Sequence, residues 1–229
     1  LRHIEHISAR SGKQSVTLTK LDNHRWRIAP CSGPLTITTV IYAWDLSVRG
    51  AHLDETHCFL NGTSVFLEVQ GQQEHPCRLT LLPPPKPTRW RAFTSMPQYA
   101  RANATKGRNG FGTYIAENYD ALIDHPIEMG DPQVIKFDAC GAPHEMVFTG
   151  LIPNLDLKRI AQDVKKICEA QIRFFEPDTA RVPFLDSATK YVFMTMVTGD
   201  AYGGLEHRAS TALMASRKDL PTLEHDKAP

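Results

Sequence analysis

Apolar and polar residues alternate in short runs through the first two thirds of the chain, which predicts a β-rich part there. Residues 35–45 form the clearest run, because Thr, Ile, Val, Tyr and Trp dominate it and a Gly-Pro pair precedes it. Asn61-Gly62 lies between two apolar runs and suits the positive φ angles of a two-residue turn, so a hairpin is expected within residues 57–69. Further strands are expected over residues 77–82, 133–139 and 144–151.

A different pattern follows in the last third of the chain. Apolar residues recur at spacings of three and four over residues 155–175, which predicts a long helix. Residues 190–198 form a nearly continuous apolar run, which is typical of a strand buried inside a sheet. We therefore expect a domain boundary near residue 153, between a β-rich domain of residues 1–153 and an α+β part of residues 154–229.

The composition is that of an ordinary globular chain, with 41% of 229 residues hydrophobic and 22% charged. A net charge of +1, with acidic and basic residues mixed, gives no basis for binding nucleic acid or an anionic membrane surface. No apolar run reaches the roughly 18 residues of a membrane span. The five cysteines form no Cys-x-x-Cys pair, which favours free thiols in a reducing compartment, and a cytoplasmic location is expected.

Residues 203–207, Gly-Gly-Leu-Glu-His, are the segment that most suggests chemistry. They follow the predicted buried strand after a Gly-Asp turn, so we expect them at an edge of its sheet. Two adjacent glycines lack Cβ atoms and allow another backbone to approach, and an extended peptide can pair with a free edge by strand addition. Glu206 beside that edge could receive an ammonium group. The same pattern also fits a glycine loop next to a solvated surface.

The segment resembles a known family. Gly-Gly-Leu-Glu-His at 203–207, together with residues 210–214 and 217–221, resembles the glycyl aminopeptidase family of zinc metallopeptidases. It is more distantly similar to the Gly-x-Met-Glu-Asn motif of the alanyl aminopeptidases. The resemblance extends over nearly the whole chain, and further similar blocks are residues 42–51, 59–64 and 122–130.

The resemblance implies that this segment binds substrate. Glu206 is implied as the group that holds the α-amino group of a peptide with a free amino terminus. Gly203 and Gly204 are implied as the backbone along which the peptide lies, with Leu205 beside them. His207 belongs to the segment but stands where the larger family has Asn.

The resemblance also implies a zinc enzyme whose metal site is elsewhere. The family binds zinc through a His-Glu-x-x-His motif, and no such sequence is present here. We therefore expect the front portion of a longer aminopeptidase that prefers Gly or Ala, with zinc in the full-length protein. We expect no catalytic residue, metal ligand or bound zinc in this chain, and no activity from it alone. The implied fold is mainly β: an antiparallel β-sandwich-like domain missing its first strands, then the start of a thermolysin-like domain.

Two other interpretations stay open at this point. A non-catalytic β-sandwich module that binds carbohydrate or protein would explain the strand-rich part and aromatic residues such as Trp44 and Trp90. Asp124, His125 and Glu128 could form an acid–base group, although Asp-His-Pro is also a good turn sequence. Because strands are expected to be missing, pairing between copies through exposed sheet edges is a further expectation.

Overall fold

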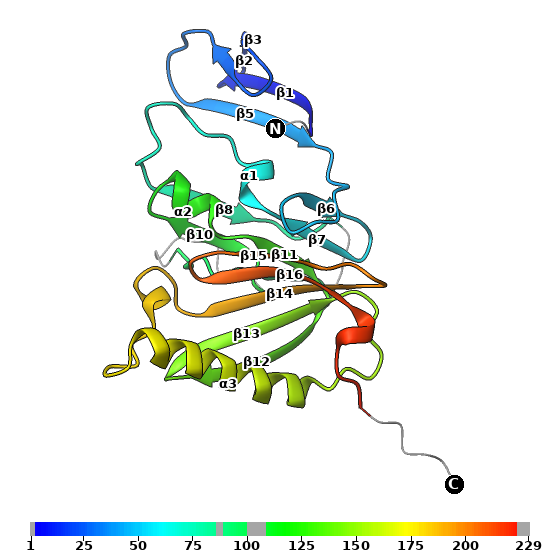
Figure 1. The fold of residues 1–229 in the computed structure, drawn as a ribbon. Coiled ribbons are helices and arrows are strands. Elements are labelled where there is room, and N and C mark those ends of the chain that lie inside the picture. The colour runs from blue at the N-terminus through cyan, green and yellow to red at the C-terminus, as the bar shows by residue number, and fades with distance from the viewer. Residues whose placement is uncertain (1–2, 86–88, 100–108, 224–229) are drawn as a thin grey trace.

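The computed structural model describes residues 3–85, 89–99 and 109–223. It shows a mainly β protein in which one long helix lies beneath a five-stranded sheet and smaller antiparallel sheets lie above it (Figure 1). No helix within these ranges is long and apolar enough to span a membrane.

Four small antiparallel sheets form the first part. A four-stranded sheet has the order β6 (Ala51–Leu53), β7 (His57–Leu60), β11 (Ile127–Gly130) and β9 (Arg91–Phe93). A three-stranded sheet pairs β2 (Gln14–Val16), β1 (Ile4–Ser11) and β5 (Leu35–Ile41). The two-stranded sheets pair β3 (Leu18–Lys20) with β4 (Trp26–Ile28), and β8 (Cys77–Leu81) with β10 (Gly112–Ala116).

The five-stranded sheet has the order β12 (Gln133–Ala139), β13 (Ala142–Thr149), β14 (Tyr191–Thr198), β16 (Ser210–Ser216) and β15 (Gly203–Glu206). Its three inner strands are parallel, and the two outer pairs are antiparallel. The predicted apolar strand is β14, which occupies the centre, so its buried position is confirmed. The sheet begins at Gln133 and therefore joins strands from both sides of the boundary expected near residue 153.

The predicted long helix is α3 (Leu157–Phe175), and the carboxylate of Asp156 caps its first turn by accepting from the amide of Arg159. Its apolar stripe packs with Met146, Phe148 and Val197 of the sheet. On the other face of the sheet, Val147, Val192 and Met194 pack against Phe59 and Phe93 of the four-stranded sheet. Apolar layers on both faces therefore fix the five-stranded sheet in place.

The hairpin turn predicted at Asn61-Gly62 is not formed. Instead, Asn61 caps the short helix α1 (Gly62–Val65), and its side-chain oxygen accepts from the amide and the hydroxyl of Thr63 at 3.1 and 2.6 Å. Its amide nitrogen donates to the carbonyl of Val48 at 3.3 Å. A Cβ on Gly62 would lie 2.7 Å from Cα of Ile123, so this glycine permits close packing of two backbones rather than a tight turn.

Asn61→Ala should destabilise the fold by about 1–3 kcal/mol, because it removes a helix cap and leaves a buried carbonyl without its donor. Asn118 is the matched control, since within the described residues it caps α2 (Tyr119–Ile123) by accepting from the amide of Ala121 alone. We expect a smaller loss, near 1 kcal/mol, for Asn118→Ala. Denaturant titration of both variants measures the difference, and equal losses would contradict the role given to Asn61.

Candidate functional site

Residues 203–206 form β15, an edge strand, as the sequence predicts. The amide of His207 donates to the carbonyl of Ser210 at 2.9 Å, and this bond closes the turn between β15 and β16. In an antiparallel pair, residues that bond across the ladder alternate with residues whose N–H and C=O groups point outward. The backbone groups of Gly204 and Glu206 therefore point to the outer edge, where no strand of the described residues pairs with them.

The side chains of β15 are divided between two faces of the sheet. Leu205 packs into the apolar layer shared with the four-stranded sheet. Glu206 pairs with Thr211 of β16, and Thr211 pairs with Phe193 of β14. Paired residues share a face of the sheet, and Phe193 packs on the face that carries α3. Glu206 is thus exposed on the face that also carries α3, and its carboxylate has no hydrogen-bond or ion-pair partner among residues 3–85, 89–99 and 109–223. The contacts of α3 are mainly with β12, at the opposite edge of the sheet, and Glu206 is exposed.

The two glycines of β15 are not required by the described packing. A Cβ at Gly203 would lie 3.8 Å from the Met214 side chain, and one at Gly204 would lie 3.6 Å from the Leu213 side chain. These are ordinary contact distances, and neither glycine has a positive φ angle. The fold would therefore accept alanine at both positions, in contrast to Gly62.

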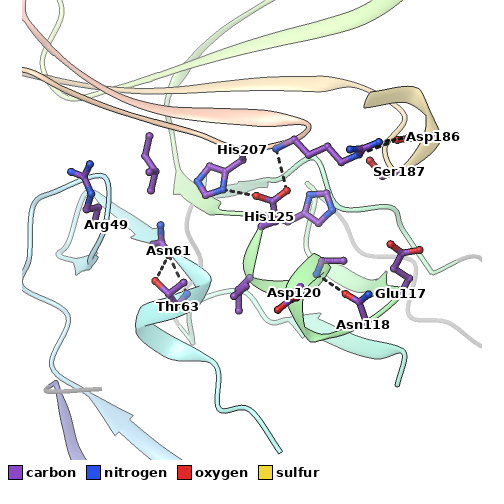
Figure 2. A pocket seen from close by; sticks show the side chains of 15 residues that line it. Arg49, Asn61, Thr63, Glu117, Asn118, Asp120, His125, Asp186, Ser187 and His207 are labelled. Atoms are coloured by element: carbon purple, nitrogen blue, oxygen red, sulfur yellow. Dashed lines mark hydrogen bonds and ion pairs between the residues drawn. The ribbon is translucent and has the colours of Figure 1, made fainter. Parts of the chain in front are cut away.

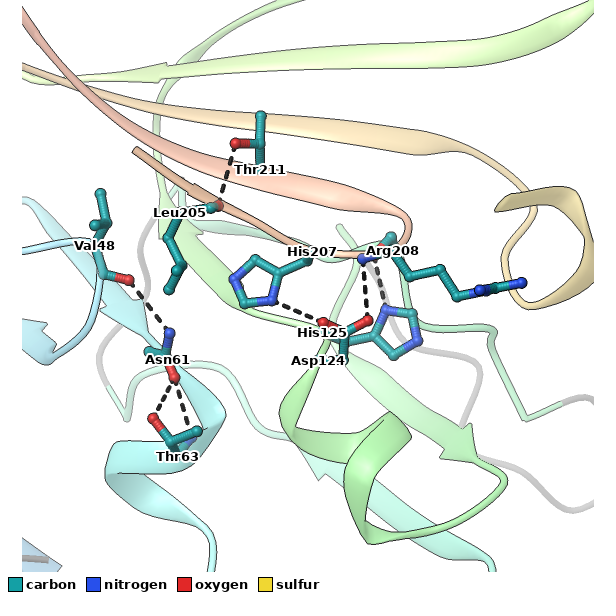
Figure 3. A network of polar contacts seen from close by, with 10 residues as sticks. Val48, Asn61, Thr63, Asp124, His125, Leu205, His207, Arg208 and Thr211 are labelled. Atoms are coloured by element: carbon teal, nitrogen blue, oxygen red, sulfur yellow. Dashed lines mark hydrogen bonds and ion pairs between the residues drawn. The ribbon is translucent and has the colours of Figure 1, made fainter. Parts of the chain in front are cut away.

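The turn after β15 is attached to the corner between α2 and β11 (Figure 3). Asp124 contacts Nδ1 of His207 at 3.0 Å and accepts from the amide of Arg208 at 3.1 Å. The Arg208 guanidinium binds the carboxylate of Asp186. Burial alone would raise the pKa of Asp124, but the contacts with His207 and Arg208 outweigh it, so its pKa is lowered.

A cavity of about 830 Å³ lies beside this turn (Figure 2). Leu205, His207 and Arg208 line one side of it, and residues from Asn61 and Thr63 to the α2 region line the other. Glu206 is not among the lining residues, because it points to the opposite face of the sheet. An amine held by Glu206 would therefore lie outside this cavity.

The three residues considered as an acid–base group have separate partners. Asp124 contacts His207, while the buried His125 contacts the hydroxyl of Ser95 at 2.8 Å. Glu128 contacts Nδ1 of His57 at 3.2 Å, and its burial raises its pKa to about 7. Burial lowers the pKa of His125 to about 4, with the nearby His207 acting in the same direction. Within the described parts of the chain, Asp124, His125 and Glu128 therefore do not form an acid–base group. Each side chain instead connects its own pair of structural elements.

Sequence reasoning missed two arrangements. Asp124 and His207 are 83 residues apart in the sequence, and no local sequence pattern predicts their contact. His52, Asp54 and His57 form the one group of three or more metal-ligand side chains found among the described residues. Their His-x-Asp-x-x-His spacing around a turn was the available signal.

Comparison with solved structures gives the class of protein. An aminopeptidase N family protein from Idiomarina loihiensis shares 40% sequence identity and superposes with a TM-score of 0.88, covering 99% of this chain and 36% of that chain. A mutant two-domain M1 zinc metallopeptidase bound to L-tryptophan is 12% identical over 89% of this chain and 49% of that chain, and its TM-score of 0.45 is too low to support an inference. The fold is therefore that of an amino-terminal region of an aminopeptidase-type protein.

Residues 1–131 match the family described as the peptidase M61 N-terminal domain. The chain therefore belongs to the peptidase M61 family, the glycyl aminopeptidases. The matched region ends just before the five-stranded sheet begins at Gln133. No curated protein matches the sequence.

The M61 family is one of zinc metallopeptidases, but the residues of β15 do not fit a zinc site. A zinc ion takes three or four His, Cys or carboxylate ligands, and the one qualifying group within the described ranges lies on the β6–β7 hairpin. The sequence contains no His-Glu-x-x-His motif. The residues of β15 therefore offer no set of zinc ligands.

The buried His125 predicts a specific pH dependence of stability. Its pKa falls from 6.5 to about 4 on folding, so between these values the unfolded chain binds a proton that the folded chain does not. The free energy of unfolding should therefore decrease as the pH falls from 6.5 to 4, by on the order of 3 kcal/mol. His125→Gln retains a partner for Ser95 and removes this titration.

Because Glu128 titrates in the opposite sense over a similar range, the informative quantity is the difference between wild type and His125→Gln. Urea unfolding at several pH values measures this difference. It should shrink by on the order of 3 kcal/mol from pH 6.5 to 4, and a difference independent of pH would show that His125 is not buried as a neutral ring.

Proposed function

We propose that this chain supplies the substrate-anchoring portion of a zinc metallo-aminopeptidase. In this proposal, Glu206 holds the α-amino group of a peptide, and the outer edge of β15 pairs with the peptide backbone. The observation that carries it is the exposed, unpartnered carboxylate of Glu206 beside an unpaired strand edge within the described structure. The membership of the chain in the M61 family supports a peptide as the class of substrate.

Glu206 and the edge groups act together in this proposal. Gly204 and Glu206 direct their backbone N–H and C=O groups outward, so an added strand would find donors and acceptors at both positions. The Glu206 side chain and the missing Gly204 side chain lie on the same face, because the residues are two apart in a strand. A peptide's ammonium group can therefore approach the carboxylate over Gly204 without meeting a Cβ atom.

This arrangement would select free amino ends over blocked ones. A hydrogen bond between charged groups contributes about 1.5–3 kcal/mol, which corresponds to a roughly ten- to hundredfold preference. Holding the amino end at a fixed point would also fix which peptide bond reaches the metal. Zinc, when bound by ligands of the larger peptidase, would polarise that bond's carbonyl and activate a water molecule. The residues of this chain would position the peptide. A thermolysin-like continuation of the five-stranded sheet and a preference for Gly or Ala belong to the same proposal.

Glu206→Gln tests the anchor in a peptidase that contains this chain. The variant keeps the size of the side chain and removes its charge, so kcat/KM for a peptide with a free amino terminus should fall about ten- to hundredfold. Glu5→Gln is the control, since Glu5 is an exposed strand carboxylate of another sheet. Steady-state hydrolysis of a free and an N-acetylated peptide measures both effects. A loss that is equal for the two peptides, or no loss, would count against the anchor.

Gly204→Ala separates substrate binding from folding. The added methyl group makes only ordinary contact with Leu213, so the melting temperature should stay within about 2 °C of the wild-type value. The same methyl group would stand beside Glu206 where the amine approaches, and kcat/KM should fall by about tenfold or more. Gly203→Ala adds its methyl group on the opposite face, near Met214, and should have a smaller effect. Equal kinetics for the two variants would contradict the assigned approach.

A further inference from the structure

The hairpin of β6 and β7 brings three metal-ligand side chains to one face. His52 and Asp54 are two residues apart, so their side chains point to the same side. The amide of Asp54 donates to the carbonyl of His57 at 3.0 Å, which places His57 directly across the turn. Residues opposite each other in an antiparallel pair share a face, so the turn assembles His52, Asp54 and His57 on one side.

The three side chains are close and largely buried. One ligand atom from each lies within 4.8 Å of the others. Nε2 of His52 is 3.2 Å from Oδ2 of Asp54. The centroids of the His52 and His57 rings are 5.0 Å apart. His52 and His57 are 5% and 7% exposed. Ligands bound tetrahedrally at about 2.0–2.2 Å from zinc lie roughly 3.3–3.6 Å from one another, so only small side-chain movements separate this group from a metal site.

Asp54 is already oriented for this role. Its Oδ1 accepts from the amide and the hydroxyl of Thr56, both at 2.7 Å, and from the amide of His57 at 3.0 Å. These bonds fix the carboxylate in the turn and direct Oδ2 toward His52. One oxygen therefore holds the loop while the other remains available as a ligand.

His57 is oriented by a second carboxylate. Its Nδ1 contacts Oε1 of Glu128 at 3.2 Å, and Glu128 is 2% exposed. Gly130 lies opposite His57, and a Cβ there would come within 3.1 Å of the Cβ of His57. Nε2 of His57 has no hydrogen bond within the described residues. A histidine held through one nitrogen by a carboxylate, with the other nitrogen free, is the usual arrangement of a metal-binding histidine.

His52 can exchange its partner without losing another bond. Its Nδ1 is buried and has no hydrogen-bond partner in the part of the chain that the structure describes. The contact with Asp54 is thus the polar contact that holds the ring, and Trp44 lies against the ring with centroids 5.0 Å apart. A metal ion shared with Asp54 would replace this one contact.

We propose that His52, Asp54 and His57 bind a divalent transition-metal ion of the zinc class, with Glu128 as the positioning residue of His57. Two imidazoles and one carboxylate suit zinc and its neighbours better than magnesium or calcium, which prefer oxygen ligands alone. Three protein ligands leave a fourth position for water or another group. This site is separate from the role proposed for Glu206 and differs from the sequence-based expectation that no zinc binds to this chain.

Titration of the metal-free 229-residue chain with Co²⁺, followed by displacement with Zn²⁺, tests the proposal. We expect one equivalent of Co²⁺ to give the visible absorption of a four-coordinate centre and Zn²⁺ to abolish it. Asp54→Asn can still accept from Thr56 and His57 in the turn but loses the charged ligand, so it should weaken binding by at least about tenfold. Glu128→Gln should weaken it by about 10- to 100-fold.

His24→Ala is the matched control, because His24 is an exposed histidine 3.4 Å from a single carboxylate, that of Asp22. It should bind cobalt as the wild type does. Circular dichroism checks that each variant folds, and excess Zn²⁺ should raise the melting temperature of the wild type but not of Asp54→Asn. Absence of a four-coordinate cobalt spectrum in the wild type, or binding that Asp54→Asn leaves unchanged, would overturn the proposal. Neither result depends on peptidase activity.

Discussion

One carboxylate, that of Asp124, holds together the two parts that the candidate site needs. It contacts Nδ1 of His207 and accepts a hydrogen bond from the amide of Arg208. These two contacts attach the β15–β16 turn to the corner between α2 and β11. The contacts lower its pKa despite burial, which keeps it charged at neutral pH. Without this attachment, the strand that presents Glu206 would be positioned by its pairing with β16 and by the packing of Leu205 alone.

The alternation of side chains along β15 gives the strand two distinct faces. Leu205 and His207 face the first part of the chain, where the cavity lies, while Gly204 and Glu206 face the side of the sheet that carries α3. The cavity and the proposed anchor therefore belong to different surfaces. Glycine at 203 and 204 has no explanation in the packing of the described residues, and a peptide along the strand edge would supply one.

The sequence predicts the elements whose signals are local. The three- and four-residue spacing of apolar residues in 155–175 corresponds to α3, and the apolar run of residues 190–198 corresponds to β14. Both patterns reflect directly which side chains each element buries. The edge position of residues 203–206 was also predictable, from glycines that follow a buried strand.

Features that depend on distant contacts could not be predicted in this way. Asn61-Gly62 has the composition of a hairpin turn, but the approach of Ile123 and the carbonyl of Val48 favour a helix cap. The composition changes near residue 153, yet the parallel pairing of β13 with β14 crosses that point, so the sheet starts at Gln133. The His52–Asp54–His57 group could not be predicted in this way, because the spacing of these residues brings them together only through the turn between β6 and β7.

A crystal structure of a peptidase that contains this chain, with a bound peptide, tests the central claim most directly. The account predicts that the peptide's terminal nitrogen lies within hydrogen-bond distance, about 2.7–3.2 Å, of the Glu206 carboxylate, and that its backbone pairs with the outer edge of Gly204 and Glu206. A terminal amine held by other residues, with Glu206 turned to solvent and the edge of β15 unpaired, would contradict it.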